Sequence, residues 1–278
     1  MLKAKAYCLA AVQPIEFTVS TFPGGEVHVR INDEAFEHTP ALIRITAHLR
    51  SVTDQMALFM LTDALRRACK APIHLDMPYV PYARQDRVCN TGEALAAKVF
   101  CQMVNAQGYE SVTIFDPHSD VVPALLDRVV VKDASGAIAQ TLDRPEFKNG
   151  VTFIAPDAGA QKRVMKLAKT FGVEHVACAE KVRDTKTGEI LGVDLDFDFP
   201  AGKPALVIDD ICDGGATFIA LSEHITTKCA PDGPLFLYVS HGIFSKGVDR
   251  VAEHYDRVFA GYNWTGFNHP NLTTLFED

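Results

Sequence analysis

One stretch of the sequence decides the fold: Ala205-Leu206-Val207-Ile208-Asp209-Asp210-Ile211-Cys212-Asp213-Gly214-Gly215-Ala216-Thr217. Its apolar beginning is typical of a buried strand, and apolar residues at helical spacing follow it. The two glycines allow a tight turn, so that successive amides at the start of the helix form a binding site for an anion. Asp209 and Asp210 would offer carboxylates to ribose hydroxyls or metal-bound water, and Thr217 would donate a hydroxyl to a phosphate. The segment therefore predicts a ribose-phosphate site. The alternative is an acidic β-turn that leads into a helix capped by Asp213.

Strand-like and helix-like segments alternate along the rest of the chain. We expect strands at residues 5–10, 16–20, 41–47, 73–77, 111–115, 151–155, 175–179, 205–209 and 235–239. We expect helices at residues 54–69, 91–106, 134–141, 160–171, 216–228 and 247–254. In the first helix, Ser51 and Asp54 form the pattern of a capping box, and four apolar residues recur at helical spacing: Met56, Phe59, Met60 and Ala64. This alternation predicts an α/β fold with mostly parallel sheets flanked by helices.

The length of 278 residues favours two domains or one large domain. A weakly apolar, charged connection around residues 127–135 separates two blocks with similar alternation. We therefore predict an N-terminal domain at residues 1–133 and a C-terminal domain at residues 134–278. Ligands of such sheets bind at the carboxyl ends of the strands, so motifs that directly follow a strand carry the most weight.

Composition excludes several classes of protein. Apolar residues make up 47% and charged residues 22% of the chain, which excludes a disordered protein. Repeats with a fixed period of 20–50 residues are absent from the sequence. Its longest apolar stretches are far shorter than the roughly 20 residues that span a bilayer, and the N-terminus has no signal-peptide pattern. The seven cysteines are scattered without a Cys-x-x-Cys pair, which predicts reduced thiols in a cytoplasmic protein.

The charge balance excludes nucleic acid as the expected partner. The formal net charge is −8 and the pI is about 5.7, so the overall field repels polyanions. A phosphorylated ligand would therefore need local arginines, backbone amides or a divalent cation.

Such local cations follow the expected strand at residues 73–77. Residues 78–87 read Pro-Tyr-Val-Pro-Tyr-Ala-Arg-Gln-Asp-Arg, with two guanidinium groups that can grip phosphate oxygens in a bidentate way. The alternative is that Arg84 and Arg87 pair with Asp86 and Glu93 on the surface.

These segments together resemble one enzyme family. The turn at residues 213–217 resembles the ribose-phosphate loop of type I phosphoribosyltransferases, and residues 78–87 closely match the signature of ribose-phosphate diphosphokinases, also called phosphoribosyl-pyrophosphate (PRPP) synthetases. Further segments resemble this family in the same order, at residues 22–26, 115–118, 155–160, 180–183 and 240–245. The resemblance identifies a divergent, short member with two tandem phosphoribosyltransferase-like domains, the first with the ATP-binding motifs and the second with the ribose-phosphate loop and a flexible catalytic loop. A base-transferring phosphoribosyltransferase would leave residues 78–87 unexplained.

The resemblance implies roles for individual residues. ATP would be bound by Phe22, Glu26, Arg84, Gln85, Asp86 and Arg87, with the first two contacting adenine in a neighbouring subunit. The ribose phosphate would be bound by Asp209, Asp210, Asp213, Gly214, Gly215, Ala216 and Thr217. His118 and Asp157 would hold Mg²⁺, although a histidine is an unusual ligand for a hard cation. Lys181 and Arg183 would act in catalysis together with His118, and residues 240–245 are interpreted as a strand-end turn without chemistry.

Each role has a simpler alternative. A lone histidine such as His118 is usually a capping or buried structural residue, and the charged segment that contains Lys181 and Arg183 is also typical of solvated surface. The turn Pro23-Gly24-Gly25 is in most proteins only a turn.

The implied reaction transfers the β,γ-diphosphoryl group of ATP to the anomeric hydroxyl of ribose 5-phosphate and releases AMP. Family members carry threonine where this chain has Gly214, which removes a hydroxyl and leaves space beside the phosphate. That space suits the alternative acceptor, ADP-ribose, which phage-type relatives use for NAD⁺ salvage. A second alternative is a non-catalytic regulatory subunit of a synthetase. The resemblance also implies a homo-oligomer, either a dimer or a hexamer.

Overall fold

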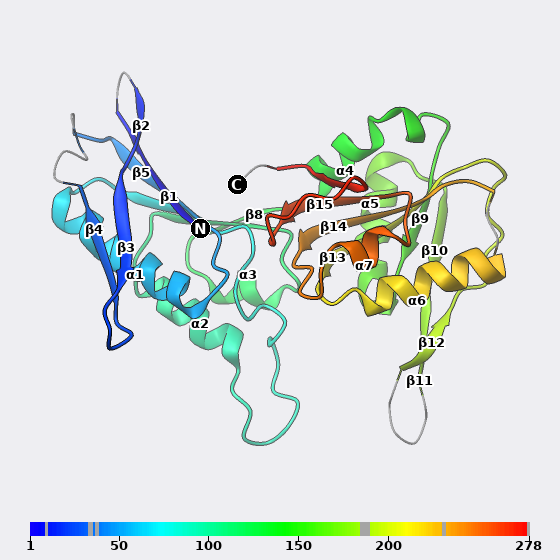
Figure 1. Cartoon of the computed structure of the whole chain (residues 1–278), viewed down its shortest axis with the longest axis horizontal. Helices are drawn as coiled ribbons and strands as arrows, with labels where there is room; N and C mark the ends of the chain where they lie inside the picture. The colour runs from blue at the N-terminus through cyan, green and yellow to red at the C-terminus, as the bar shows by residue number, and fades with distance from the viewer. Residues whose placement is uncertain (9–10, 33–35, 37–38, 184–189, 230–231, 277–278) are drawn as a thin grey trace. The chain divides into compact units, whose positions relative to one another are not determined.

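The computed structural model of the chain describes residues 1–8, 11–32, 36, 39–183, 190–229 and 232–276, with the backbone alone for residues 181–183 and 190–193. The chain divides into two compact units, Met1–Asp133 and Ala134–Asp278. Each unit has its own six-stranded sheet and its own buried core (Figure 1).

The sheet of the first unit has the strand order β2-β1-β5-β6-β7-β8. Its strands are β1 (Leu2–Tyr7), β2 (Val12–Pro14), β5 (Leu42–Ala47), β6 (Ile73–Asp76), β7 (Ser111–Phe115) and β8 (Val129–Lys132). β1 pairs antiparallel with β2 and β5, whereas β5 to β8 are parallel. The unit also contains the hairpin β3 (Phe17–Thr21) and β4 (Val27–Ile31) and the helices α1 (Val52–Ala68), α2 (Ala96–Asn105) and α3 (Val121–Leu125).

Helix α1 begins with the predicted capping box. The Ser51 hydroxyl accepts from the Asp54 amide, and the Asp54 carboxylate accepts from the Ser51 amide. The core contains Leu58, Leu61 and Leu65, while Met56 and Met60 are 38% and 43% exposed. Two overlapping apolar stripes thus run along the helix, and the leucine stripe lies in the core.

The sheet of the second unit is entirely parallel, in the order β10-β9-β13-β14-β15-β16. Its strands are β9 (Thr152–Ala155), β10 (His175–Cys178), β13 (Ala205–Cys212), β14 (Leu235–Gly242), β15 (Arg257–Asn263) and β16 (Leu272–Thr274). Its helices are α4 (Ser135–Leu142), the short 3₁₀ turn η1 (Pro145–Phe147), α5 (Ala158–Phe171), α6 (Ala216–His224), the π-helical turn η2 (Ile225–Cys229) and α7 (Asp249–Ala252). The predicted α/β class with mostly parallel sheets is therefore confirmed.

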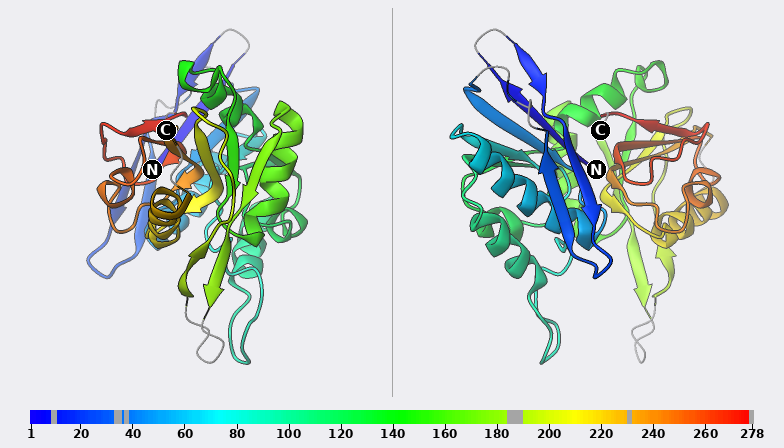
Figure 2. Two further views of the ribbon diagram at one scale, coloured as in Figure 1. Left: turned by 90° about the vertical axis from the view of Figure 1, so that its right-hand side faces the viewer. Right: turned by 60° about the vertical axis from the view of Figure 1, so that its left-hand side comes forward.

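A hairpin of β11 (Glu180–Arg183) and β12 (Ile190–Asp194) extends away from the sheet of the second unit (Figure 2). The resemblance implies a flexible catalytic loop here, and the described residues on either side of residues 184–189 form two antiparallel strands, from Glu180 opposite Asp194. Residues 184–189 lie outside the described residues.

Three other boundaries differ from the predictions. The helix expected from residue 91 begins only at Ala96, because the Glu93 side chain accepts from the amides of Cys89 and Asn90 and holds a turn there. The charged connection around residues 127–135 contains β8, in which Val130, Val131 and Lys132 are exposed. β13 and β14 continue beyond residues 209 and 239, because they stay paired as far as Cys212 and Gly242.

The predictions about membranes and cysteines have the following outcome. No helix among the described residues is both long and apolar enough to cross a bilayer. All seven cysteines fall within the described residues, and each is a free thiol.

Candidate functional site

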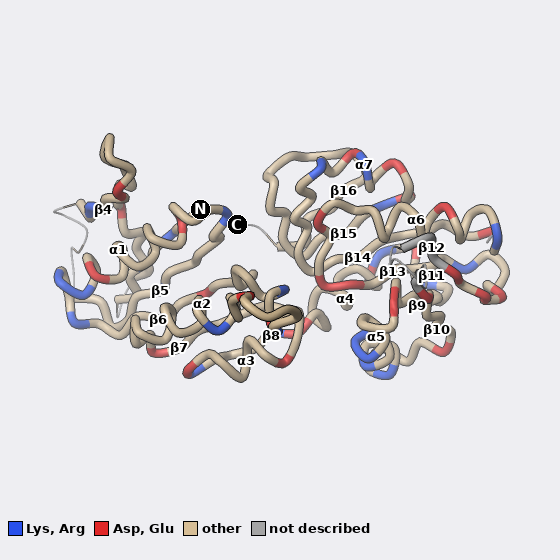
Figure 3. Tube along the Cα trace, turned by 90° about the horizontal axis from the view of Figure 1, so that it is seen from below, with Lys and Arg blue, Asp and Glu red and all other residues tan. Residues whose placement is uncertain are grey.

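The candidate site of the second unit begins with two carboxylates inside β13. Asp210 is 4% exposed, and its Oδ1 lies 3.0 Å from the Arg163 guanidinium, which is also 3.6 Å from Asp209 Oδ1. Arg163 comes from α5, which follows the neighbouring strand β9 and is rich in basic residues (Figure 3). The half-buried Arg163 guanidinium thus faces two adjacent carboxylates.

The electrostatics of this pair are unusual for aspartate. Burial, followed by the charge of Asp210, raises the pKa of Asp209 well above its ordinary value, and Arg163 opposes the shift only in part. The Asp209 Oδ1 also accepts from the Asp210 amide at 2.9 Å. The carboxyl oxygens of Asp209 and Asp210 can accept hydrogen bonds from sugar hydroxyls.

The turn after β13 presents backbone amides to solvent. Gly215 is the residue before the first turn of α6; its φ is +80°, and no side chain caps the first-turn amides. A Cβ on Gly215 would lie 2.3 Å from Val251 Cγ2, so only glycine fits. The uncapped amides of Ala216 and Thr217 at the positive end of the helix can therefore receive an anion.

A second turn, at residues 243–246, packs against this phosphate turn. The Ser245 hydroxyl donates to Asp213 Oδ1 at 2.5 Å, and the Ser245 amide donates to the Asp213 carbonyl. The side chain of Lys246 runs 3.5–3.8 Å from the position of a Cβ on Gly214. The lysine stem thus borders the space beside Gly214 at ordinary van der Waals distance.

Asp157 follows β9 and is the N-cap of α5. Its Oδ1 accepts from the Ala160 amide at 3.0 Å, so that the capping role is present whether or not the residue also binds a metal. Asp157 is half-buried at the carboxyl end of its strand, as the sequence predicted.

The predicted catalytic residues Lys181 and Arg183 lie on β11. Lys181 is opposite Val193 and Arg183 is opposite Ile190, with a shift in register between Val182 and Arg183. Of these two residues the structure describes the backbone, and their side chains lie outside the described part.

The candidate site of the first unit is built on the turn after β6. Buried Val80 and Ala83 anchor this turn, and the Gln85 amide donates to the Tyr82 carbonyl, with Tyr82 at a φ of 62°. Arg84, Gln85 and Arg87 are exposed. The alternation of anchored and exposed residues holds the two guanidinium groups toward solvent, where a polyphosphate is accessible.

Asp86 has a different setting from its neighbours. Its side chain is 10% exposed, it accepts from the Ser119 hydroxyl at 2.6 Å, and it lies 3.6 Å from the Arg87 guanidinium. One of the expected surface ion pairs is thus present. The Asp86–Ser119 bond connects the arginine turn to the segment that follows β7, the strand next to β6.

His118 belongs to that segment after β7 and is exposed. The buried Asp116 just before it has a φ of 37°, and its amide donates to the Lys132 carbonyl of β8. The chain therefore turns sharply at the end of β7, and this turn brings His118 to the same sheet edge as Arg84 and Arg87.

Phe22 and Glu26 close the β3–β4 hairpin. The Phe22 amide donates to the Glu26 carbonyl, and Gly25 between them has a φ of +90°. The Phe22 ring is 54% exposed and packs against His28 with ring centroids 5.5 Å apart. An aromatic ring presented in this way can stack on a planar ligand.

The structure thus assembles the predicted residues into two groups, one in each unit. Arg84, Arg87 and His118 share one sheet edge in the first unit, and Asp209, Asp210 and the glycine turn adjoin in the second. Sequence reasoning missed Arg163, Ser245 and Lys246. Arg163 lies six residues beyond Asp157 on a basic helix, a signal that gains meaning only once α5 is placed beside β13.

The side chains predicted to bind Mg²⁺ can be compared with the ligands that this ion prefers. Among the described residues, no group of three or more His, Cys, Asp and Glu side chains is arranged to hold a metal. Mg²⁺ is commonly held by one or two carboxylates together with substrate phosphates. The carboxylate of Asp157 fits that chemistry, and the imidazole of His118 fits it less well.

Comparisons with known proteins agree with one another. Residues 2–108 match the family described as the N-terminal domain of ribose phosphate pyrophosphokinase. The chain is 28% identical to the ribose-phosphate pyrophosphokinase of Thermococcus kodakarensis, over 90% of this chain and 86% of the relative. It is 29% identical to the protein of the same name from Pyrococcus abyssi, over 86% of this chain and 81% of the relative.

The fold has a counterpart among solved structures. The crystal structure of phosphoribosylpyrophosphate synthetase from Mycobacterium smegmatis superposes with a TM-score of 0.74 and covers 94% of this chain and 86% of that one. At 23% sequence identity, this likeness shows the fold: two tandem phosphoribosyltransferase-like domains.

Proposed function

Because the chain belongs to the ribose-phosphate pyrophosphokinase family, we propose that it transfers the β,γ-diphosphoryl group of ATP to the 1-hydroxyl of ribose 5-phosphate. The products are phosphoribosyl pyrophosphate and AMP. One observation carries the proposal. Asp209 and Asp210 lie near the end of β13 beside Arg163, and the uncapped amides at the start of α6 follow them in the chain. This arrangement suits a sugar that carries a phosphate.

In the transfer itself, the 1-hydroxyl of the sugar attacks the β-phosphorus of ATP. The bond between the β-phosphorus and the oxygen bridging to the α-phosphate breaks, AMP leaves with that oxygen, and the hydroxyl proton is released. Such reactions depend on alignment and on neutralisation of charge more than on covalent chemistry of the protein.

The residues of this chain supply those two requirements. Arg84, Gln85 and Arg87 would grip the triphosphate, and Lys181 and Arg183 would neutralise charge that develops on the transferred group. Asp209 and Asp210 would orient the ribose hydroxyls, while Asp213 to Thr217 hold the 5-phosphate. Asp86, bonded to Ser119, would fix the arginine turn beneath the nucleotide.

Mg²⁺ would accompany ATP and supply charge neutralisation at the phosphates. Asp157, assisted by His118, would hold it from the protein. The exposed Phe22 and the nearby Glu26 would contact the adenine of ATP bound in a neighbouring subunit, which makes a homo-oligomer, a dimer or a hexamer, part of the proposal. No nucleic acid or membrane partner is proposed.

The alternative acceptor is ADP-ribose, which carries a diphosphate diester in place of the terminal phosphate. The side chain of Lys246 beside Gly214 favours ribose 5-phosphate, because it offers a cation near the dianion of a phosphate monoester. A non-catalytic regulatory subunit is less favoured, since His118, Asp157, Lys181 and Arg183 are all present.

The test measures AMP release by the purified protein with ATP, Mg²⁺ and one sugar at a time. We expect faster release with ribose 5-phosphate than with ADP-ribose, and no release above background with unphosphorylated ribose. Faster release with ADP-ribose would transfer the assignment to that acceptor. Absence of release with every sugar would support the regulatory subunit.

A further inference from the structure

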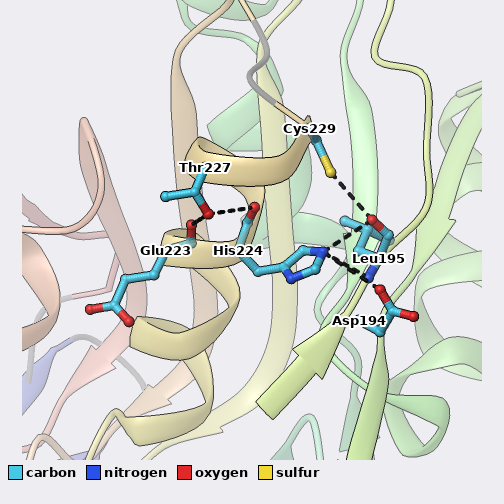
Figure 4. A network of polar contacts seen from close by, with 6 residues as sticks. All are labelled: Asp194, Leu195, Glu223, His224, Thr227 and Cys229. Atoms are coloured by element: carbon cyan, nitrogen blue, oxygen red, sulfur yellow. Dashed lines mark hydrogen bonds and ion pairs between the residues drawn. The ribbon is translucent and has the colours of Figure 1, made fainter.

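A histidine and a cysteine contact the backbone amide and carbonyl of Leu195 (Figure 4). The Leu195 amide donates to His224 Nε2 at 3.2 Å, and the same Nε2 lies 3.3 Å from the Leu195 carbonyl oxygen. The Cys229 thiol donates to that carbonyl at 3.3 Å. Whether or not Nε2 carries a proton, the imidazole therefore has a partner on this peptide. We name His224 and Cys229 the Leu195 clamp.

The clamp connects two elements of the proposed active site. Leu195 directly follows β12, which pairs with β11, the strand that carries Lys181 and Arg183. His224 is the last residue of α6, the helix whose first turn is the proposed phosphate site. The clamp thus attaches the base of the hairpin to the phosphate-binding helix, within one compact unit.

The π-helical turn at the end of α6 brings Cys229 into the clamp. In this turn the Thr227 hydroxyl donates to the Glu223 carbonyl at 2.6 Å, a carbonyl near the end of the regular helix. Burial, followed by the charges of Asp196 and Asp194, raises the pKa of the Cys229 thiol, so that it remains a donor at neutral pH. π-helical turns of this kind are frequent at functional sites.

The segment after β12 is held by packing as well as by the clamp, because Leu195 belongs to the buried core and Phe197 and Phe199 pack against that core. Residues 194–199 alternate three aspartates with Leu195, Phe197 and Phe199, and they border an open cavity of about 580 Å³ together with His224 and Cys229. The Leu195 side chain is 4% exposed, and its backbone amide and carbonyl are held by the hydrogen bonds of the clamp. Water from the cavity can replace a lost partner, so removal of the clamp loosens the segment without unfolding the core.

We infer that His224 and Cys229 are positioning residues for diphosphoryl transfer: they fix the base of the β11–β12 hairpin and thereby the placement of Lys181 and Arg183. The effect on diphosphoryl transfer rests on the proposed function. The attachment of the hairpin to α6 does not depend on that function.

The experiment compares His224→Ala, His224→Gln and a matched control, His269→Ala. His269 has the same 19% side-chain exposure and the same 3.7 Å contact to an aspartate, and it also accepts from a backbone amide, but it lies outside the hairpin and α6. His224→Ala should lower kcat about 10- to 100-fold, as expected for misplaced catalytic groups, and leave the KM for the sugar within about twofold. Glutamine, which keeps a donor and an acceptor, should restore most of kcat, and His269→Ala should have no effect.

A second readout needs no activity. Hydrogen exchange of the backbone amides at residues 190–199 should be faster in His224→Ala than in the wild type, and unchanged in His269→Ala. If His224→Ala does not fold, Cys229→Ala, which removes one bond, should give the same changes at smaller size. Unchanged exchange at residues 190–199, or an unchanged kcat in an active enzyme, would overturn the inference. Absence of activity in the wild type would instead overturn the proposed function and leave the exchange result to decide on the clamp.

Discussion

Asp209 shows how a single residue can set the pH dependence of stability. Its pKa is raised chiefly by burial and by the neighbouring Asp210, so the folded state binds the proton more tightly than the unfolded state does. The free energy of unfolding therefore falls as the pH rises from the ordinary aspartate range toward the raised value, and stays lower above it. We predict that Asp209→Asn raises the melting temperature more at pH 8 than at pH 5, as measured by calorimetry.

The same substitution should impair function. An amide keeps only one of the two acceptor oxygens of a carboxylate and carries no charge, and a hydrogen bond to a charged group contributes about 1.5–3 kcal/mol. The KM for the sugar should therefore rise about tenfold or more. A stability gain that grows toward acid pH would contradict the assignment of the raised pKa to Asp209.

Gly215 allows a second prediction at this scale, because its two constraints can be separated. Gly215→Ala places a Cβ both at a φ of +80° and 2.3 Å from Val251 Cγ2, whereas Gly172→Ala meets only the positive φ of +66° with nothing within 4 Å. We expect Gly172→Ala to lower the free energy of unfolding by about 1 kcal/mol and Gly215→Ala by about 2 kcal/mol more, in urea titrations. The double variant Gly215→Ala, Val251→Ala should recover part of the difference. Equal losses in the two single variants would show that the contact with Val251 is unimportant.

At the scale of elements, local signals predicted the cap of α1 and the interiors of several strands. The capping box at Ser51 and Asp54 is formed as expected, and β7 has the expected bounds, because these features depend on neighbours in sequence. The buried face of α1 and the ends of β13 were not predictable in this way. Which stripe of a helix is buried, and how far a strand stays paired, depend on the elements that pack against them.

The β11–β12 hairpin is the element on which the proposed chemistry depends most. If Lys181 neutralises developing charge, Lys181→Ala should lower kcat by about 10²–10³-fold, the loss typical for removal of one electrostatic partner in a transition state. Its circular dichroism and melting temperature should match the wild type, because the hairpin lies outside the sheet of its unit. Lys186→Ala is the control for simple loss of charge in the same segment. An unchanged kcat in Lys181→Ala would remove the hairpin from the mechanism.

At the scale of the whole molecule, the sequence predicted the motifs that form the candidate site of each unit. It did not predict the residues of other elements that contact those motifs. The motifs that follow β6, β7, β9 and β13 were recognisable because parallel sheets gather ligands at strand ends. Arg163, Ser245 and Lys246 were not, since they reach the site from α5 and from the turn after β14 and are ordinary surface-type residues in sequence. The same holds for His224, whose partner Leu195 is 29 residues away.

The seven thiols give a test that samples both units at once. Burial raises the pKa of Cys101 to about 11, and burial with the charges of Asp209 and Asp213 raises the pKa of Cys212 to about 12, whereas Cys89 is exposed on a turn. At pH 8 about one in a thousand Cys101 side chains and fewer of Cys212 would be thiolate, the reactive form. Iodoacetamide should therefore label Cys89 in the native protein and leave Cys101 and Cys212 unlabelled until urea is added, as read by peptide mass spectrometry. Labelling of Cys212 at the rate of Cys89 would mean that β13, and with it the carboxylate pair of the candidate site, is not buried as described.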